Sequence, residues 1–198
     1  MSDESEIPSG HGIIPKHGGF RNLRSFQIAQ LVYDRTVAFC EQNIDRRSRT
    51  HDQMVQAARS GVQNIAEGSL ASATSKKFEL KLTGVARASL GELLLDYEDF
   101  LRHKDLRLWE KDSAEALAVR NRYKSDRSDN PDVSDKPDRS EMSDLSDPET
   151  QANTTICLIH QASYLLWRQM QSLEKAFLSD GGFSEQLYRA RNARRKQP

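Results

Sequence analysis

Apolar side chains recur every three or four residues over most of the chain, which is the spacing of one face of an α-helix. The first run continues without a break through Leu23, Phe26, Gln30, Tyr33, Val37, Cys40 and Ile44. This period predicts a helix over about 21–45, and its repetition further along the chain predicts an all-α fold. The charged segment DRRSRTHD ends the first helix.

The second helical pattern is unusual because its seam is rich in small residues. The seam positions are Met54, Ala58, Gly61, Ile65 and Gly68. Glycine inside a helix costs about 1 kcal/mol relative to alanine, but the missing Cβ atom lets a neighbouring backbone approach closely. We expect a helix that is capped by Thr50 or Asp52 and continues to about Ala71. The alternative is that Gly68 ends it, because glycine favours the position just after a helix.

Two apolar stripes run along the third pattern, which begins at Ser75 by the same capping logic. The first stripe contains Phe78, Leu82, Val85, Ser89, Leu93 and Phe100, and the second contains Leu90, Leu94, Tyr97 and Leu101. Together they are wider than one seam within a chain requires. Two interpretations stay open: a central, well-buried helix, or a helix whose second stripe packs against another subunit.

Helical periodicity returns at Glu149, after a weakly helical segment at 105–124 in which Leu117 and Tyr123 are the expected anchors. The seam of this last long pattern is Ile156, Ile159, Ser163, Leu166, Met170, Leu173 and Phe177. Three further apolar residues lie off the seam and indicate a second buried face: Leu158, Leu165 and Trp167. The glycines of SDGGF end the helix.

Composition divides the chain into five segments. They are a flexible leader at 1–19, helices one to three with a short helical segment at 20–124, a disordered acidic linker at 125–148, the fourth long helix at 149–180, and a basic C-terminal tail at 181–198. The Ser-Asp repeats of the linker bury too little apolar surface to offset ordering entropy. Short connections make the first three helices alternate in direction. The predicted fold is an up-down four-helix bundle with a disordered acidic insertion before the last long helix.

Several classes of function lack a sequence signal. No apolar run approaches the length of a membrane span, and the acidic N-terminus is not a secretory signal. Cys40 and Cys157 lie in helical patterns without metal-ligand spacing, so we expect reduced core residues in a cytoplasmic protein. The Glu-x-x-His pairs of di-iron bundles, the G-x-S-x-G element and the phosphate-binding loop do not occur. We therefore expect no catalytic residues, metal, cofactor or membrane partner.

One spacing is typical of an enzyme. Arg46 and His51 are separated by four residues, as in the Arg-x4-6-His element of some helical ribonucleases. The arginine would stabilise a phosphate, and the histidine would act as acid or base. Both residues fall in the predicted turn between the first two helices, where an arginine-rich segment gives this spacing by chance. A ribonuclease is therefore the weaker alternative to a non-enzymatic function.

A set of polar residues lies within the helical patterns two and three. Its members are Arg59, Ser60, Asn64, Glu67 and the neighbouring Gly68 on the second helix, with Ser89 and Glu92 on the third. Side chains three or four residues apart share a helix face, and buried polar groups must be paired. We expect a hydrogen-bond network between the helices that fixes their register. The alternative is a contact with a ligand or another subunit.

These residues also carry a family resemblance. The segments FRNLRSFQIA at 20–29, QMVQAARSGVQNIAEGS at 53–69 and FELKLTGVARASLGEL at 78–93 resemble the four-helix-bundle proteins encoded in 23S rRNA intervening sequences. The segment ICLIHQASYLLWRQMQSLEKAFLSDGGF at 156–183 resembles the suffix region found on a subset of that family. The similarity covers about 20–102 and the helix beginning near 149, and the acidic insertion departs from the short family members.

The resemblance implies an up-down bundle that assembles as a pentamer around a central channel. A related branch is the accessory protein of diversity-generating retroelements, a basic pentamer that engages a reverse transcriptase and nucleic acid. No catalytic residue is carried over from the family. The polar set Arg59, Asn64, Glu67, Ser89 and Glu92 would be its structural signature.

The leading hypothesis is a homo-oligomeric scaffold that binds RNA or DNA. The candidate contacts are the turn residues Arg46, Arg47 and Arg49, the pair Lys76 and Lys77, and the tail residues Arg189, Arg191, Arg194, Arg195 and Lys196. A ring of copies would multiply these charges, and affinity for phosphates rises steeply with the number of contacts. Lysine plus arginine and aspartate plus glutamate both number 29, however, so the positive charge is local. The alternative is a protein-interaction or structural oligomer without a nucleic-acid role.

Overall fold

The computed structural model describes residues 19–123, 147–181 and 183–195, and all its regular elements are helical. The elements are η1 (Phe20–Asn22), α1 (Arg24–Asn43), α2 (Arg49–Ala71), α3 (Lys76–His103), α4 (Ala114–Arg122), α5 (Pro148–Asp180) and α6 (Phe183–Arg195). The predicted all-helical class is confirmed for these ranges. The predictions for the leader and for most of the acidic linker fall at 1–18 and 124–146, outside the described residues.

Side-chain caps explain where the long helices begin. The N-cap of α2 is Ser48, whose Oγ accepts a hydrogen bond from the Thr50 amide at 3.2 Å. The prediction of Thr50 or Asp52 as the cap was wrong, because both residues already lie inside the first turn. Asp52 there faces the positive end of the helix dipole. The predicted cap of α3 is confirmed, since Ser75 Oγ accepts from the Phe78 amide at 3.1 Å.

The fourth long helix, α5, begins one residue before the prediction. Asp147 caps it by accepting hydrogen bonds from the amides of Glu149 and Thr150, at 3.2 and 2.8 Å. Pro148 occupies the first turn, where the missing amide hydrogen costs nothing. Gly181 ends the helix with a positive φ of 74°, a backbone conformation that glycine adopts without strain.

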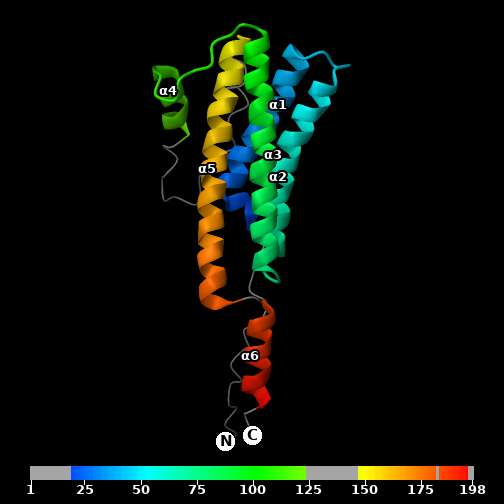
Figure 1. Cartoon of the computed structure of the whole chain (residues 1–198), viewed down its shortest axis with the longest axis vertical. Helices are drawn as coiled ribbons and strands as arrows, with labels where there is room; N and C mark the ends of the chain where they lie inside the picture. Colours follow the sequence, from blue (N-terminus) through cyan, green and yellow to red (C-terminus); the bar gives the residue numbers. More distant parts are fainter. Residues whose placement is uncertain (1–18, 124–146, 182, 196–198) are drawn as a thin grey trace, which may run out of the picture.

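The helices α1, α2, α3 and α5 lie side by side, and we call these four the bundle (Figure 1). Extensive contacts join α1 to α2, α2 to α3, α3 to α5 and α5 to α1. The pairs that show direction are Gly61 with Leu90 and Gly68 with Leu82 between α2 and α3, and Asn43 with Gln151 and Ser25 with Gln169 between α1 and α5. In both pairs of helices the residue number rises on one as it falls on the other, so both pairs are antiparallel.

Aromatic side chains fill the centre of the bundle. The Phe39 ring lies 4.9 Å from the Tyr97 ring and 4.8 Å from the Phe100 ring, between centroids. Tyr97 is fully buried, and its hydroxyl donates to Thr36 Oγ1 at 3.1 Å. Thr36 Oγ1 in turn donates to the Val32 carbonyl at 2.7 Å. Burial raises the pKa of Tyr97, so the phenol stays neutral and both hydroxyls are satisfied.

The two glycines of α2 lie inside a continuous helix, as predicted. A Cβ atom on Gly61 would lie 3.0 Å from Leu90 Cδ2. On Gly68 it would lie 3.4 Å from the Glu79 carbonyl oxygen. The helices α2 and α3 therefore approach each other closely at both positions, and this approach explains why the helix tolerates glycine.

The second stripe of α3 packs within the chain. Leu90, Tyr97 and Leu101 are buried in the bundle core. The interpretation of α3 as a central helix is therefore correct for this stripe, and the alternative of a subunit contact there is wrong. Two members of the first stripe are exposed instead, Phe78 at 48% and Val85 at 39%. The buried members of the two stripes serve the two neighbours of α3, since this helix contacts both α2 and α5.

The short helix α4 packs on the outside of α5 (Figure 1). Ala116 is its buried residue, whereas the predicted anchor Leu117 is exposed. Tyr123 is buried as predicted, and its carbonyl accepts hydrogen bonds from Arg24 at 2.8 Å and from Gln161 at 3.3 Å. The end of α4 is therefore tied to both α1 and α5.

The second buried face predicted for α5 is present only in part. Leu158 is fully buried, Leu165 is half-buried and Trp167 is exposed. The seam residue Phe177 is exposed as well, near the end of the helix. Among the described helices, none is both long enough and apolar enough to cross a membrane.

Candidate functional site

Three members of the predicted polar set meet between α2 and α3. The hydroxyl oxygens of Ser60 and Ser89 lie 2.9 Å apart. Asn64 Nδ2 donates to the Ser60 carbonyl at 2.8 Å and to Ser60 Oγ at 3.1 Å. The predicted network between the helices therefore exists at these residues. It satisfies polar groups beside the close approach at Gly61, which favours a structural role.

The charged members of the set do not join this network. Arg59, Glu67 and Glu92 are exposed, and Gly68 contributes to the close approach of the helices instead. Glu67 and Glu92 each immediately precede a buried residue, and one step along a helix turns a side chain by about 100°. The structure therefore places these three charged residues outside the hydrogen bonds that join Ser60, Asn64 and Ser89.

Exposed basic residues occupy both ends of the bundle. The residues Arg46, Arg47 and Arg49, which we call the turn arginines, are exposed at the connection between α1 and α2. Lys77 is exposed and Lys76 half-buried at the connection between α2 and α3. These connections are separated by the 23 residues of α2, which span about 35 Å at 1.5 Å per residue. The turn arginines and the pair Lys76 and Lys77 therefore lie at opposite ends of α2 and do not form one continuous surface within a chain.

The basic tail forms the helix α6, which extends beyond the bundle at the end that carries the connection between α2 and α3 (Figure 1). Three of its residues, which we call the α6 arginines, are exposed: Arg189, Arg191 and Arg195. The side chain of Arg194 and all of Lys196 lie outside the described residues. Tyr188, at 68% exposure, shares a helix face with Arg191 and Arg195. Sequence reasoning found the charge but missed this aromatic residue.

The residues of the ribonuclease alternative have different surroundings. Arg46 Nη2 lies 3.9 Å from Glu41 Oε1, and both side chains are exposed. His51 belongs to the first turn of α2 rather than to the predicted turn, and its side chain is largely covered. His51 Nδ1 lies 3.5 Å from Asp52 Oδ1. These contacts do not favour a joint action of Arg46 and His51 on a phosphate.

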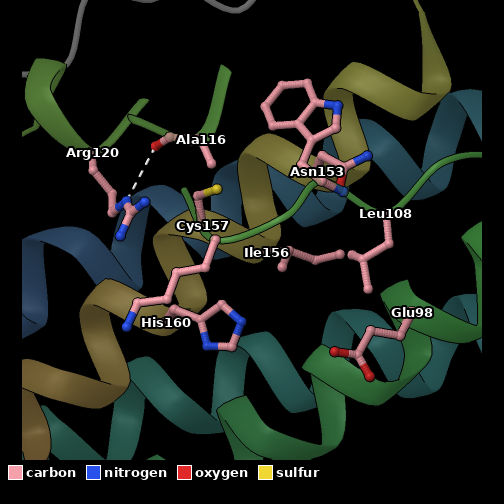
Figure 2. Close-up of a pocket in the computed structure, with 10 residues that line it drawn as sticks. Glu98, Leu108, Ala116, Arg120, Asn153, Ile156, Cys157 and His160 are labelled. Carbon is pink, nitrogen blue, oxygen red and sulfur yellow. Dashed lines mark hydrogen bonds between the residues drawn. The ribbon is translucent and has the colours of Figure 1, made fainter. Parts of the chain in front are cut away.

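A cavity that the sequence did not predict lies between α4, α5 and the connection from α3 to α4 (Figure 2). Asn153 supports its wall from α5. Its Oδ1 accepts from the Trp109 amide at 2.7 Å, and its Nδ2 donates to the Arg107 carbonyl at 2.8 Å. The sequence feature that could have indicated this cavity is an asparagine within the apolar pattern of α5. A buried asparagine needs hydrogen-bond partners, and here backbone groups of the connection from α3 to α4 supply them.

Similarity to known proteins gives no independent guide to the site. Comparisons of the chain with protein-family models, with curated proteins and with solved structures found no match. Within the described ranges, no three His, Cys, Asp or Glu side chains are grouped to hold a metal ion. The functional argument therefore depends on the charges and contacts described above.

Proposed function

We propose that the protein is a non-enzymatic, homo-oligomeric scaffold of the up-down four-helix-bundle class, and that it binds RNA or DNA through α6. The observation that carries this proposal is the exposure of the α6 arginines on a helix that extends past the bundle. The sequence of α6 contains four arginines against one glutamate. Nucleic-acid affinity depends on such local charge, because each neutralised phosphate releases counterions.

The exposed ring of Tyr188 supports the same function. Aromatic side chains beside basic residues stack on bases of single strands and tolerate any sequence. Lys77 lies at the same end of the bundle and adds a further positive charge. The interface proposed here therefore combines phosphate contacts with one stacking platform.

Oligomerisation is the second part of the proposal. Membership of the family encoded in 23S rRNA intervening sequences would make the assembly a pentamer, and a reverse transcriptase would be a partner by analogy with the related accessory protein. Several copies of α6 would raise the affinity for one nucleic acid through effective concentration. The exposed side chains of Phe78 and Val85 on α3, and of Tyr164 and Trp167 on α5, are available for subunit contacts.

The test is a fluorescence-anisotropy titration of labelled single-stranded RNA and DNA, repeated over a range of salt concentrations. Replacing the three α6 arginines by glutamine removes three phosphate contacts, so the slope of log affinity against log salt falls by about 2 for a single strand. Replacing the three turn arginines by glutamine is the matched control. Equal loss in both variants, or no binding by the unmodified protein at about 50 mM salt, contradicts the proposal.

A second candidate is a protein-interaction oligomer without a nucleic-acid role. The observation that favours it is the exposed aromatic pair Tyr164 and Trp167, whose ring centroids lie 5.9 Å apart on α5. Aromatic residues of this kind are typical anchors of protein interfaces. A solution mass above that of one 22.5 kDa chain, together with no binding to RNA or DNA, would favour this candidate.

A further inference from the structure

The cavity beside α4 has the size and lining of a small-molecule site. Its volume is about 380 Å³, within the usual range for ligand pockets. Apolar walls come from Leu108, Trp109, Ala116 and Ile156. The polar lining residues are Glu98, Lys111, Arg120, Asn153, Cys157 and His160. An apolar body and a small number of polar contacts are therefore available to a ligand.

Arg120 supplies a positive charge at one end of the cavity. Its Nε donates to the Ala116 carbonyl at 3.3 Å, which holds the side chain against α4. Its Nη2 is buried and has no hydrogen-bond acceptor among the described residues. The ion pair of this atom with Asp112 is 3.6 Å long, and the Asp112 side chain is 85% exposed. Because Nη2 itself is covered, a charged acceptor in the cavity would bind the accessible part of the Arg120 side chain, which keeps 25% of its surface exposed.

The two ends of the cavity differ in charge. Figure 2 shows Arg120 at one end and Glu98, with Leu108, at the other. A ligand with one negative charge satisfies Arg120, whereas a second negative charge on its far side would approach the Glu98 carboxylate. Lys111, an exposed residue of the same lining, adds a second positive charge, so the arrangement favours an anionic group away from Glu98 on an otherwise apolar molecule.

The chemistry of Cys157 favours binding over covalent reaction. Its thiol lies in the lining between Arg120 and Ile156 (Figure 2). Burial raises the pKa of Cys157, although the Arg120 charge opposes the shift. The thiol is therefore neutral at neutral pH and adds a weakly polar surface to the cavity, since the thiolate is the nucleophilic form.

We propose that this cavity binds a small monocarboxylate with an apolar body. The carboxylate accepts hydrogen bonds from Arg120, and the body packs against Trp109 and Ile156. The site is independent of the proposed nucleic-acid function, because none of its residues belongs to α6 or to the turn arginines.

The experiment uses 4-phenylbutyrate as the probe and its neutral amide as the control. The chain has two tryptophans, so Trp167→Phe leaves Trp109 in the cavity as the only fluorescent indole. We expect a saturable change in Trp109 fluorescence and an affinity for the carboxylate about tenfold or more above that for the amide. Equal affinities, or no saturable change up to about 1 mM of either compound, overturn the proposal.

Two cavity variants and one control on the surface test the origin of the charge preference. We expect Arg120→Gln to remove the preference for the carboxylate, and Arg87→Gln, at an exposed position of α3, to leave it unchanged. His160 is exposed at the cavity, so His160→Glu does not disturb the core, and the new carboxylate should also reduce the preference. An unchanged preference in Arg120→Gln, or its loss only when the α6 arginines are replaced, overturns the proposal.

Discussion

Replacing Gly61 by alanine tests the close approach of α2 and α3. An alanine in a helix interior gains about 1 kcal/mol over glycine. At this position, however, the new Cβ atom would lie 3.0 Å from Leu90 Cδ2 and 3.1 Å from Leu90 Cγ. Leu90 is fully buried, so it cannot move aside without disturbing its neighbours. Overpacking of this kind costs about 1–3 kcal/mol, and we expect a net loss of about 1 kcal/mol.

The matched control is Gly91→Ala on α3. A Cβ atom there meets nothing within 4 Å, so the substitution keeps the gain in helix propensity without the clash. We expect the free energy of unfolding to rise by about 1 kcal/mol. The difference between the two variants, about 2 kcal/mol, isolates the packing cost because the propensity gain is the same in both. Gly68→Ala should fall between them, since its Cβ contacts begin at 3.4 Å.

The assay is urea unfolding followed by circular dichroism, with the slope of the free energy against urea compared among the variants. A difference of about 2 kcal/mol corresponds to about 4–8 °C in melting temperature for a chain of this size. An increase in stability for Gly61→Ala equal to that for Gly91→Ala would refute the close approach. The glycine-rich seam would then need another explanation.

Three further predictions follow from the contacts of single residues. Tyr97→Phe should lower the free energy of unfolding by about 1–2 kcal/mol in urea titrations, because Thr36 loses its hydrogen-bond donor; no change would contradict this bond. Asp147→Ala should cost about 1 kcal/mol at pH 7. Hydrogen bonds from Thr150 hold the pKa of Asp147 below its ordinary value, so the cost should be complete above that ordinary pKa and be lost as the pH falls through the lowered pKa. Burial raises the pKa of Cys40 to about 12, so iodoacetamide should modify it in urea but not in the folded protein, as mapped by mass spectrometry.

The sequence predicted the long helices because each has an uninterrupted apolar period. The first helix was expected over about 21–45 and spans Arg24–Asn43, and the second ends at Ala71 as expected. The cap of α2 was harder to predict, because Ser48, Thr50 and Asp52 are all residues that cap helices well. The residue whose backbone is extended just before the first helical turn becomes the cap, and the sequence does not determine which of the three adopts that conformation.

The exposure of individual residues on α3 and α4 was less predictable. A wide apolar surface does not reveal whether the helices that cover it come from the same chain. In this structure α2 and α5 cover the two faces of α3. The short helix α4 touches its neighbours through the small residue Ala116, so Leu117 remains outside despite its larger apolar side chain.

The candidate site was predictable in its residue types but not in its geometry. Ser60, Asn64 and Ser89 form the expected network, while spacing alone did not exclude Arg59 and Glu67 from it. Spacings of three and four residues define a face, but they do not say which side of that face meets the neighbouring helix. The cavity was not predicted because it needs the connection from α3 to α4 to return over α5.

If the proposed nucleic-acid function holds, the continuity of α2 through its glycines determines which basic groups one nucleic acid can reach on one chain. It separates the turn arginines from Lys77 by about 35 Å, which is the length of about ten base pairs at 3.4 Å each. The α6 arginines, in contrast, lie within six residues on one helix, or about 9 Å. Under the proposed function, contact through α6 would therefore require only a short site, and additional copies of the chain would lengthen it. Replacing the turn arginines and the α6 arginines in separate variants would consequently measure the contribution of each end of the bundle to nucleic-acid affinity.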